Sequence, residues 1–170
     1  KAKVMCEDIA TITDPLKFWK EHSGTNDRPD IVHGGPPCQS FSQAGKQKGL
    51  DDDRGLLIFE FLRFVEKIKP SFFVMENVSN LKGVGGGKLY KQIVERAEAA
   101  GYSVTSGVLL AADYGTPQMR RRLLFIGSRK GLPKIQMPEP MHGQGESLFG
   151  AKPYVSVGEA FDGLPLLNEK

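Results

Sequence analysis

Two short apolar segments flank one amphipathic segment, and this arrangement constrains the fold more than any other feature. Residues 30–35 (DIVHGG) and 71–78 (SFFVMENV) are rich in branched or aromatic residues and predict buried strands. Residues 54–70 predict a helix that ends at Pro70. Its apolar side chains recur near helical spacing, at Leu57, Phe61, Leu62, Phe64, Val65 and Ile68. A strand, a helix and a strand in this order predict a parallel pair with a right-handed crossover.

The chain continues to alternate helix and strand up to about residue 131. Residues 88–101 predict a second helix, and the strand-like segments 102–115 and 120–130 are expected to pair as an antiparallel hairpin. Residues 132–170 show no clear periodicity and predict an extended connection with one short helical turn at 155–165. The predicted architecture is α/β, a mostly parallel open sheet with an antiparallel strand at one edge.

Length and composition fit one globular domain in a reducing, intracellular setting. The chain has 170 residues, of which 39% are hydrophobic and 25% charged. No apolar run is long enough to span a membrane, and the first residues lack the apolar core of a signal peptide. The net charge of +3 is too small to indicate a nucleic-acid partner by itself.

The cysteines and histidines do not form a metal-ligand pattern. Cys6 and Cys38 are the two cysteines, and no cysteine or histidine pair has the spacing of a zinc site, since His22, His33 and His142 are scattered. We therefore expect two free thiols and no metal.

Cys38 is the first candidate for chemistry because it follows two prolines directly after the first predicted strand. Pro36 and Pro37 stiffen the backbone, and ligand sites in open parallel sheets form beyond the carboxyl ends of the strands. A rigid thiol at such a place has the features of a nucleophile. The alternative is a small buried hydrophobic residue, although the polar neighbours of Cys38 favour the first interpretation.

Glu76 and the arginines at 120–122 are the other candidates. Glu76 ends an apolar strand, where a carboxylate partly removed from water could act as a proton donor; a strand-end cap or an ion pair is the alternative. On a strand, Arg120 and Arg122 point to the same face and could hold a carboxylate, a substrate oxygen or a phosphate. A solvated basic edge is the alternative interpretation. The glycine-rich segment 82–88 (KGVGGGK) does not match a phosphate-binding loop and predicts a flexible surface loop.

Three motifs in this order resemble those of the cytosine-5 DNA methyltransferases. GPPCQSFS at 35–42 is similar to the family's Pro-Cys nucleophile loop, and MENV at 75–78 to its Glu-Asn-Val motif. DYGTPQMRRRLLFIG at 113–127 is similar to the Gln-x-Arg-x-Arg motif, and EDI at 7–9 to an acidic segment that contacts the cofactor. The resemblance runs from about residue 3 to residue 131 and implies part of a Rossmann-like methyltransferase fold that uses S-adenosylmethionine.

The resemblance also implies a mechanism. The Cys38 thiolate would add to carbon 6 of a cytosine, which makes carbon 5 able to take the methyl group. Glu76 would protonate or hydrogen-bond ring nitrogen 3, Arg122 would hold the carbonyl oxygen, and Arg120 would steady the nucleophile loop. Because this chemistry needs both faces of the ring, the base must leave the duplex stack.

The same resemblance assigns the binding residues. Asp8 would accept from the adenine amino group of the cofactor, Ile9 and Leu57 would pack on the adenine, and Pro37 would lie near the reacting methyl group. Asn77 would brace the Pro-Cys loop. The implied DNA contacts are Gln39, in the space left by the flipped base, Ser42 and Lys46 on phosphates, and Gln118.

Two parts of the family pattern are not found in this sequence. One is the Phe-x-Gly-x-Gly turn that holds the methionine part of the cofactor, with the acidic strand end that follows it; the other is most of the recognition region with the last two motifs. We therefore expect a fragment, with residues 1–131 as the central part of the catalytic domain and 132–170 leading towards the target recognition region. Alone, it is expected to be inactive and to self-associate through uncovered sheet edges.

The leading hypothesis is thus part of a cytoplasmic DNA methyltransferase from a bacterial modification system, with double-stranded DNA as partner and a restriction endonuclease as a possible companion. Two alternatives stay open. One is a transfer RNA cytosine-5 methyltransferase, which shares the nucleophile and glutamate motifs. The other is a catalytically inactive module that binds nucleic acid.

Overall fold

The computed structural model describes residues 4–37, 56–144 and 150–164. These residues form two compact units, the first comprising Lys1–Gly107 with Leu123–Met137 and the second Val108–Arg122 with Pro138–Lys170. Each unit is described by itself below.

The helices and strands follow the order expected from the sequence, with one α-helix added near the N-terminus and two short strands, β5 and β6, added in the predicted extended connection. They are the 3-10 turn η1 (Ile9–Thr11), α1 (Pro15–Ser23), β1 (Ile31–Gly34), α2 (Leu56–Ile68), β2 (Phe72–Val78), the 3-10 segment η3 (Ser79–Gly87), α3 (Lys88–Ala99), β3 (Tyr102–Leu110), the 3-10 turn η4 (Ala111–Tyr114), β4 (Arg121–Arg129), β5 (His142–Gly143), β6 (Lys152–Pro153) and α4 (Val157–Phe161).

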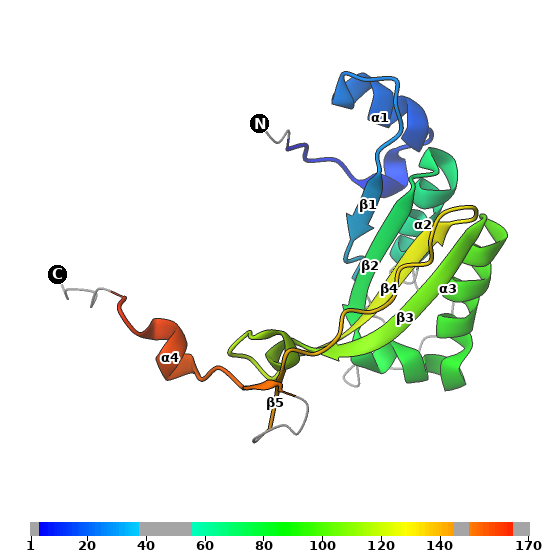
Figure 1. Ribbon diagram of the computed structural model, residues 1–170. Helices are drawn as coiled ribbons and strands as arrows, with labels where there is room; N and C mark the ends of the chain where they lie inside the picture. Colours follow the sequence, from blue (N-terminus) through cyan, green and yellow to red (C-terminus); the bar gives the residue numbers. More distant parts are fainter. Residues whose placement is uncertain (1–3, 38–55, 145–149, 165–170) are drawn as a thin grey trace. The chain divides into compact units, whose positions relative to one another are not determined.

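The main sheet has the strand order β1-β2-β4-β3. β1 and β2 pair in parallel, with Gly34 opposite Met75, which confirms the predicted parallel pair. β4 runs against its neighbours, because its Arg129 amide donates to Ser71 at the start of β2 and Lys130 donates to Gly101 at the start of β3. The α/β class is therefore confirmed. The reversed strand lies one place in from the edge, with β3 outermost (Figure 1).

The core of the first unit lies between this sheet and helices α2 and α3. Apolar residues that recur at helical spacing on both helices pack onto alternate residues of β2 and β4. The buried cluster consists of Ile58, Phe61, Leu62, Val65, Phe73, Met75, Leu81, Leu89, Ile93, Ala97, Tyr102, Leu123 and Phe125. At its centre the Phe73 ring meets the rings of Phe61 and Tyr102 edge to face, with centroids 6.2 Å and 5.2 Å away. Phe73 is fully buried.

Helix α1 was not expected from apolar periodicity, because only Pro15 of its nine residues is buried. Its end signals are nevertheless in the sequence. The Asp14 side chain accepts from the amides of Leu16 and Lys17, Pro15 occupies the first turn, and Gly24 ends the helix at φ 74°. Capping residues therefore mark a helix here that the apolar pattern does not reveal.

Helix α2 ends at Ile68 because Pro70 disfavours a right-handed helical conformation at the residue before it. Lys69 takes φ 52°, in the left-handed region. Side chains then donate to the carbonyl groups of this turn: Arg28 to Ile68 at 2.6 Å, Arg129 to Lys69 at 3.2 Å, and the Tyr102 hydroxyl to Pro70 at 2.8 Å. The turn between α2 and β2 is therefore held by residues from other elements.

Replacing Tyr102 with phenylalanine is expected to lower the free energy of unfolding by about 1–3 kcal/mol near neutral pH, because the buried Pro70 carbonyl loses its donor. Burial raises the pKa of Tyr102 to about 12, against the opposing effect of Arg129 and Arg28. An unfolded tyrosine ionises at about pH 10. Between these values only the unfolded chain releases the proton, so the wild type loses stability there and the variant does not.

Urea unfolding of both proteins from about pH 9 to about pH 12 measures this effect, and the stability difference between them should shrink as the pH rises. Parallel curves for the two proteins would contradict the role given to the Tyr102 hydroxyl.

The segment that follows β4 crosses the end of the hairpin. The Ile135 amide donates to the hydroxyl of the buried Ser128 on β4 at 3.0 Å, and the Thr105 hydroxyl on β3 donates to the Ile135 carbonyl at 2.7 Å. Figure 1 shows this segment running across β3 and β4. No helix or strand lies in the described stretch between the end of β4 at Arg129 and the start of β5 at His142.

The second unit is organised around Asp113 of η4. The Asp113 carbonyl accepts from the Met141 amide at 2.9 Å, and its carboxylate accepts from the Tyr154 hydroxyl at 2.7 Å. This hydrogen bond raises the pKa of Tyr154. Ser156 and Glu159 form a capping box that starts α4, the predicted short helical turn.

Within the described residues, no helix is long and apolar enough to cross a membrane.

Candidate functional site

The carboxyl ends of β1 and β2 bring several predicted site residues together. Because the two strands are parallel and Gly34 lies opposite Met75, the residues after β1 run beside the last residues of β2. Glu76 and Asn77 belong to this end of β2. The predicted shared end of the two strands is therefore present in the structure, and the loop that continues towards Cys38 starts there.

Asn77 links the two strand ends directly. Its side-chain nitrogen donates to the Pro36 carbonyl at 3.0 Å, and its side-chain oxygen accepts from the Val78 amide at 2.9 Å. Asn77 is 4% exposed, so water cannot readily replace either partner. This is the contact that a residue bracing the proline-rich loop needs.

The Glu76 carboxylate lies close to the backbone of Gly35. A Cβ atom added at Gly35 would be 3.2 Å from Glu76 Oε2, which is tighter than most real contacts of this kind. Glu76 is half-buried and alternates along β2 with the buried residues Met75 and Asn77, whose side chains point to the opposite face of the sheet. Glycine at position 35 therefore allows the Glu76 carboxylate to approach the loop after β1. The sequence alone does not show this role, because a glycine after a strand is common.

Four of the predicted residues fall between Pro37 and α2. Cys38, Gln39, Ser42 and Lys46 lie outside the described residues.

The predicted cofactor residues lie on two elements of the first unit and on the loop after β1. Asp8 is the exposed N-cap of η1 and accepts from the Ala10 amide at 2.9 Å. Ile9, in η1, and Leu57, in the first turn of α2, are half-buried, and Pro37 is exposed. η1 and α2 are in contact with each other. Asp8, Ile9 and Leu57 therefore lie on two elements that contact each other.

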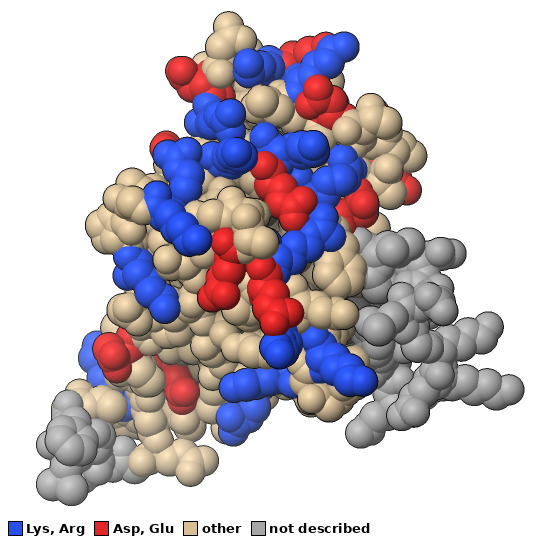
Figure 2. Space-filling model, turned by 90° about the vertical axis from the view of Figure 1, so that its right-hand side faces the viewer, with Lys and Arg blue, Asp and Glu red and all other residues tan. Residues whose placement is uncertain are grey.

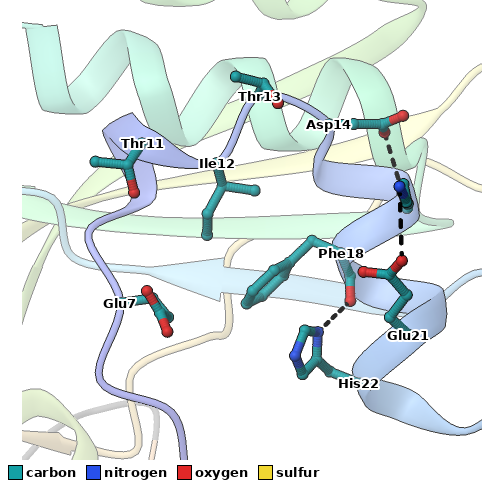
Figure 3. A pocket seen from close by; sticks show the side chains of 9 residues that line it. Glu7, Thr11, Ile12, Thr13, Asp14, Phe18, Glu21 and His22 are labelled. Carbon is teal, nitrogen blue, oxygen red and sulfur yellow. Dashed lines mark hydrogen bonds and ion pairs between the residues drawn. The ribbon is translucent and has the colours of Figure 1, made fainter.

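A pocket of about 380 Å³ flanks this group (Figure 3). It lies between η1 and α1. The Lys17 amide donates to the Asp14 carboxylate at 3.0 Å, and its ammonium group lies 3.8 Å from Glu21 Oε1. Figure 3 shows the His22 ring directed at the Phe18 carbonyl, which it contacts at 2.8 Å. The lining residues are Glu7, Thr11, Ile12, Thr13, Asp14, Lys17, Phe18, Glu21 and His22. None of them is a predicted site residue, so the pocket and the predicted cofactor residues are neighbours rather than one site.

The remaining predicted residues belong to the second unit. Gln118 and Arg120 are exposed and lie in a tight turn, in which the Arg120 amide donates to the Gln118 carbonyl at 2.9 Å. β4 begins at Arg121, so Arg120 precedes the strand that was expected to include it. Strand alternation therefore does not relate Arg120 to Arg122. Arg122 is half-buried, and one of its nitrogens donates to the Arg121 carbonyl.

The face on which α3 lies carries charges of both signs. Figure 2 shows Lys and Arg side chains around a smaller group of Asp and Glu side chains. Ion pairs within and between the helices account for part of this pattern, including Glu66 with Arg96 and Lys91 with Glu95. Mixed, paired charges are typical of a solvated surface, and we assign no nucleic-acid contact to this face.

Known proteins similar to this chain are methyltransferases. The chain is 46% identical over 151 residues to type II methyltransferase M.AquIA of Picosynechococcus sp., covering 80% of this chain and 60% of that protein. It is 41% identical over 169 residues to type II methyltransferase M1.HphI of Haemophilus parahaemolyticus, covering 98% of this chain and 42% of that protein. The chain thus spans about half the length of these relatives.

A solved structure agrees with this result. A crystal structure from E. coli, described as a prophage-encoded DNA modification methyltransferase, matches with a TM-score of 0.71 at 28% identity, covering 95% of this chain and 42% of that one. The family model for C-5 cytosine-specific DNA methylases matches residues 1–151. Together with the identity to the type II enzymes, this match shows that the chain belongs to the C-5 cytosine-specific DNA methylase family.

Proposed function

We propose that this chain is the central part of a DNA cytosine-5 methyltransferase of a bacterial modification system. Residues 1–131 are its catalytic portion, and residues 132–170 lead to the region that recognises the target sequence. The observation that carries the proposal is the hydrogen bond from Asn77 to Pro36, beside the close approach of Glu76 to Gly35. These contacts tie a carboxylate to the loop that continues into Cys38.

In the proposed reaction the Cys38 thiolate forms a bond to carbon 6 of a cytosine that has left the duplex stack. Glu76 protonates or hydrogen-bonds ring nitrogen 3, which takes up the electron density that the thiolate brings into the ring. Carbon 5 would then bond to the methyl group while the bond from that group to the cofactor's sulfur breaks, with S-adenosylhomocysteine as the leaving group, and would lose its proton to a base. The bond between sulfur and carbon 6 breaks, which restores both the aromatic ring and the thiolate.

Arg122 and Arg120 are assigned to the proposed reaction by the motif resemblance. Arg122 holds the carbonyl oxygen of the base, where negative charge increases during the addition. Arg120 steadies the nucleophile loop. Gln39, Gln118, Ser42 and Lys46 contact DNA, the last two through phosphates, which position the duplex without reading its sequence.

S-adenosylmethionine supplies an electrophilic methyl group when bound. The residues of this chain fit its adenosyl part in their chemistry. Asp8 uses one carboxylate oxygen for the Ala10 amide and is exposed, so it retains acceptor positions for an amino group. Ile9 and Leu57 provide apolar surface for the adenine ring, and Pro37 lies in the loop expected near the methyl group.

Methyl transfer by the full-length protein tests the proposal. The protein is incubated with labelled S-adenosylmethionine and either unmethylated duplex DNA or transfer RNA. A third sample contains duplex DNA in which 5-fluorocytosine replaces cytosine; because the fluorine is not lost as a proton is, the sulfur–carbon bond stays intact. We expect label in DNA only, a denaturation-resistant adduct with the fluorinated duplex, and mass-spectrometric assignment of that adduct to Cys38.

The other outcomes point to the alternatives. Label in transfer RNA alone would show that the protein is a transfer RNA methyltransferase. The absence of both label and adduct would indicate a catalytically inactive module that binds nucleic acid. An adduct on Cys6 would contradict the mechanism. The 170-residue chain alone is expected to give neither label nor adduct.

A further inference from the structure

Arg63 joins three parts of the first unit through one guanidinium group. From its place on α2 it donates to the Ile9 carbonyl of η1 at 3.0 Å and to the Thr13 carbonyl at 3.5 Å. Its Nε donates to Glu60 Oε2 at 2.7 Å. The guanidinium also lies over the Phe64 ring, 5.3 Å from the centroid. The Arg63 side chain is only 20% exposed, so these contacts are substantially shielded from water.

The segment that Arg63 contacts has little else to hold its shape. η1 has three residues, none of them buried. Among its internal hydrogen bonds, the Ala10 amide donates to the Asp8 carboxylate, and the Thr11 amide and hydroxyl donate to the Asp8 carbonyl. The Ile12 amide donates to the Ile9 carbonyl in a long bond of 3.4 Å. A single 3-10 turn of this kind is not stable by itself in water. The bond from α2 therefore helps to hold its position, together with the packing of the half-buried Ile9 and Ile12.

We propose that Arg63 is a positioning residue that orients the Asp8–Ile9 segment for the adenine of the cofactor. This inference rests on the proposed function, which assigns the adenine to Asp8, Ile9 and Leu57. Because Leu57 lies on the same helix as Arg63, α2 both provides one side of the adenine site and holds the other side in place.

Arg63 acts here through the geometry of its donors rather than through its charge. Glu60 Oε2 lies 2.6 Å from Arg63 Nη2 and neutralises the guanidinium. The fork of N–H groups then reaches the Ile9 carbonyl and Glu60 at the same time, which a lysine ammonium at the end of a flexible chain does less well. Arg63→Lys should therefore retain part of the effect and Arg63→Met none.

Arg96 provides a matched control. It lies on α3, donates to Glu66 of α2 at 2.6 Å and 3.1 Å, and lies over the Phe59 ring at 5.4 Å. Its side chain is 35% exposed. Arg96→Met thus removes an ion pair and a ring contact with residues of α2, as Arg63→Met does, but no contact with η1.

Calorimetric titration of the full-length protein with S-adenosylhomocysteine measures the effect without turnover. Since loss of a charged hydrogen bond corresponds to about a tenfold or larger change in an equilibrium constant, Arg63→Met should raise Kd at least about tenfold. Arg96→Met should change Kd less than about twofold, and Arg63→Lys should fall between. In steady-state assays KM for S-adenosylmethionine should rise with Kd, while kcat at saturation stays within about threefold of the wild type.

Amide hydrogen exchange in the same proteins without ligand gives an independent measurement. Exchange at Ala10, Thr11 and Ile12 should become faster in Arg63→Met and in Arg63→Lys, and should be unchanged in Arg96→Met. If Arg63→Met does not fold, Arg63→Lys carries the comparison.

The outcomes separate this inference from the proposed function. A wild-type protein that binds neither S-adenosylhomocysteine nor S-adenosylmethionine would overturn the proposed function. Binding by the wild type with an unchanged Kd in Arg63→Met would overturn only the role of Arg63. Equal losses in Arg63→Met and Arg96→Met, with kcat falling in both, would show that the arginines stabilise the fold and position nothing.

Discussion

Replacing Gly127 with alanine is expected to lower the free energy of unfolding by about 3 kcal/mol or more, at the upper end of what overpacking costs. The added Cβ would lie 1.9 Å from Phe73 Cε1, 2.3 Å from Cδ1 and 2.6 Å from Cζ. The ring cannot move aside, because Phe73 is fully buried between the rings of Phe61 and Tyr102. The strain therefore falls on the pairing of β2 with β4.

Chemical denaturation of Gly127→Ala and Gly83→Ala measures this effect. Gly83 is the control, since a Cβ there meets nothing within 4 Å, and its substitution should change stability by less than about 0.5 kcal/mol. The double variant Gly127→Ala with Phe73→Leu should recover part of the loss, because the smaller side chain leaves room for the methyl group. Equal stability of the two single variants would refute the close packing of Gly127 on Phe73.

Replacing Glu76 with glutamine is expected to reduce kcat of the full-length methyltransferase by about 10²- to 10⁴-fold, the usual range for loss of a general acid. Glutamine has nearly the same shape, so the close approach to Gly35 and the burial of Asn77 are retained. The amide cannot protonate ring nitrogen 3. The loss should therefore appear in turnover while the thermal midpoint stays near that of the wild type.

Glu66→Gln is the control for this experiment. It weakens the ion pair with Arg96 on the helices but lies outside the proposed site, so kcat should stay within about threefold of the wild type. Methyl transfer to duplex DNA at saturating S-adenosylmethionine measures both variants. A Glu76→Gln enzyme that turns over at the rate of Glu66→Gln would exclude Glu76 as the proton donor.

Local patterns in the sequence were sufficient to predict α2, α3, β1 and β2, and the parallel pairing of the two strands. Apolar spacing located α2 and α3, and the apolar runs located β1 and β2 with their parallel pairing. These features are local, because the burial of one face of a helix or strand repeats with a fixed period along the chain. The motif resemblance located the family in the same way, since its residues are contiguous in sequence.

The apolar pattern did not reveal which strand would be outermost or that residues 15–23 form a helix. The hairpin of β3 and β4 can join β2 through either strand, and its own pattern is the same in both cases; the structure has β4 beside β2. Helix α1 lacks a buried stripe and depends on the cap at Asp14 and the stop at Gly24. Arg120 falls one residue before β4, since strand boundaries depend on neighbouring strands and not on the chain alone.

The sequence by itself thus determined the α/β elements, their order and the family. Only the tertiary structure decided the contacts that join distant residues: Asn77 with Pro36, Gly127 with Phe73, and Arg63 with Ile9. Each of these contacts links positions more than forty residues apart in the printed sequence. Periodicity reports which face of an element is buried, whereas the partner of a buried donor or glycine depends on how whole elements pack, which no local pattern contains.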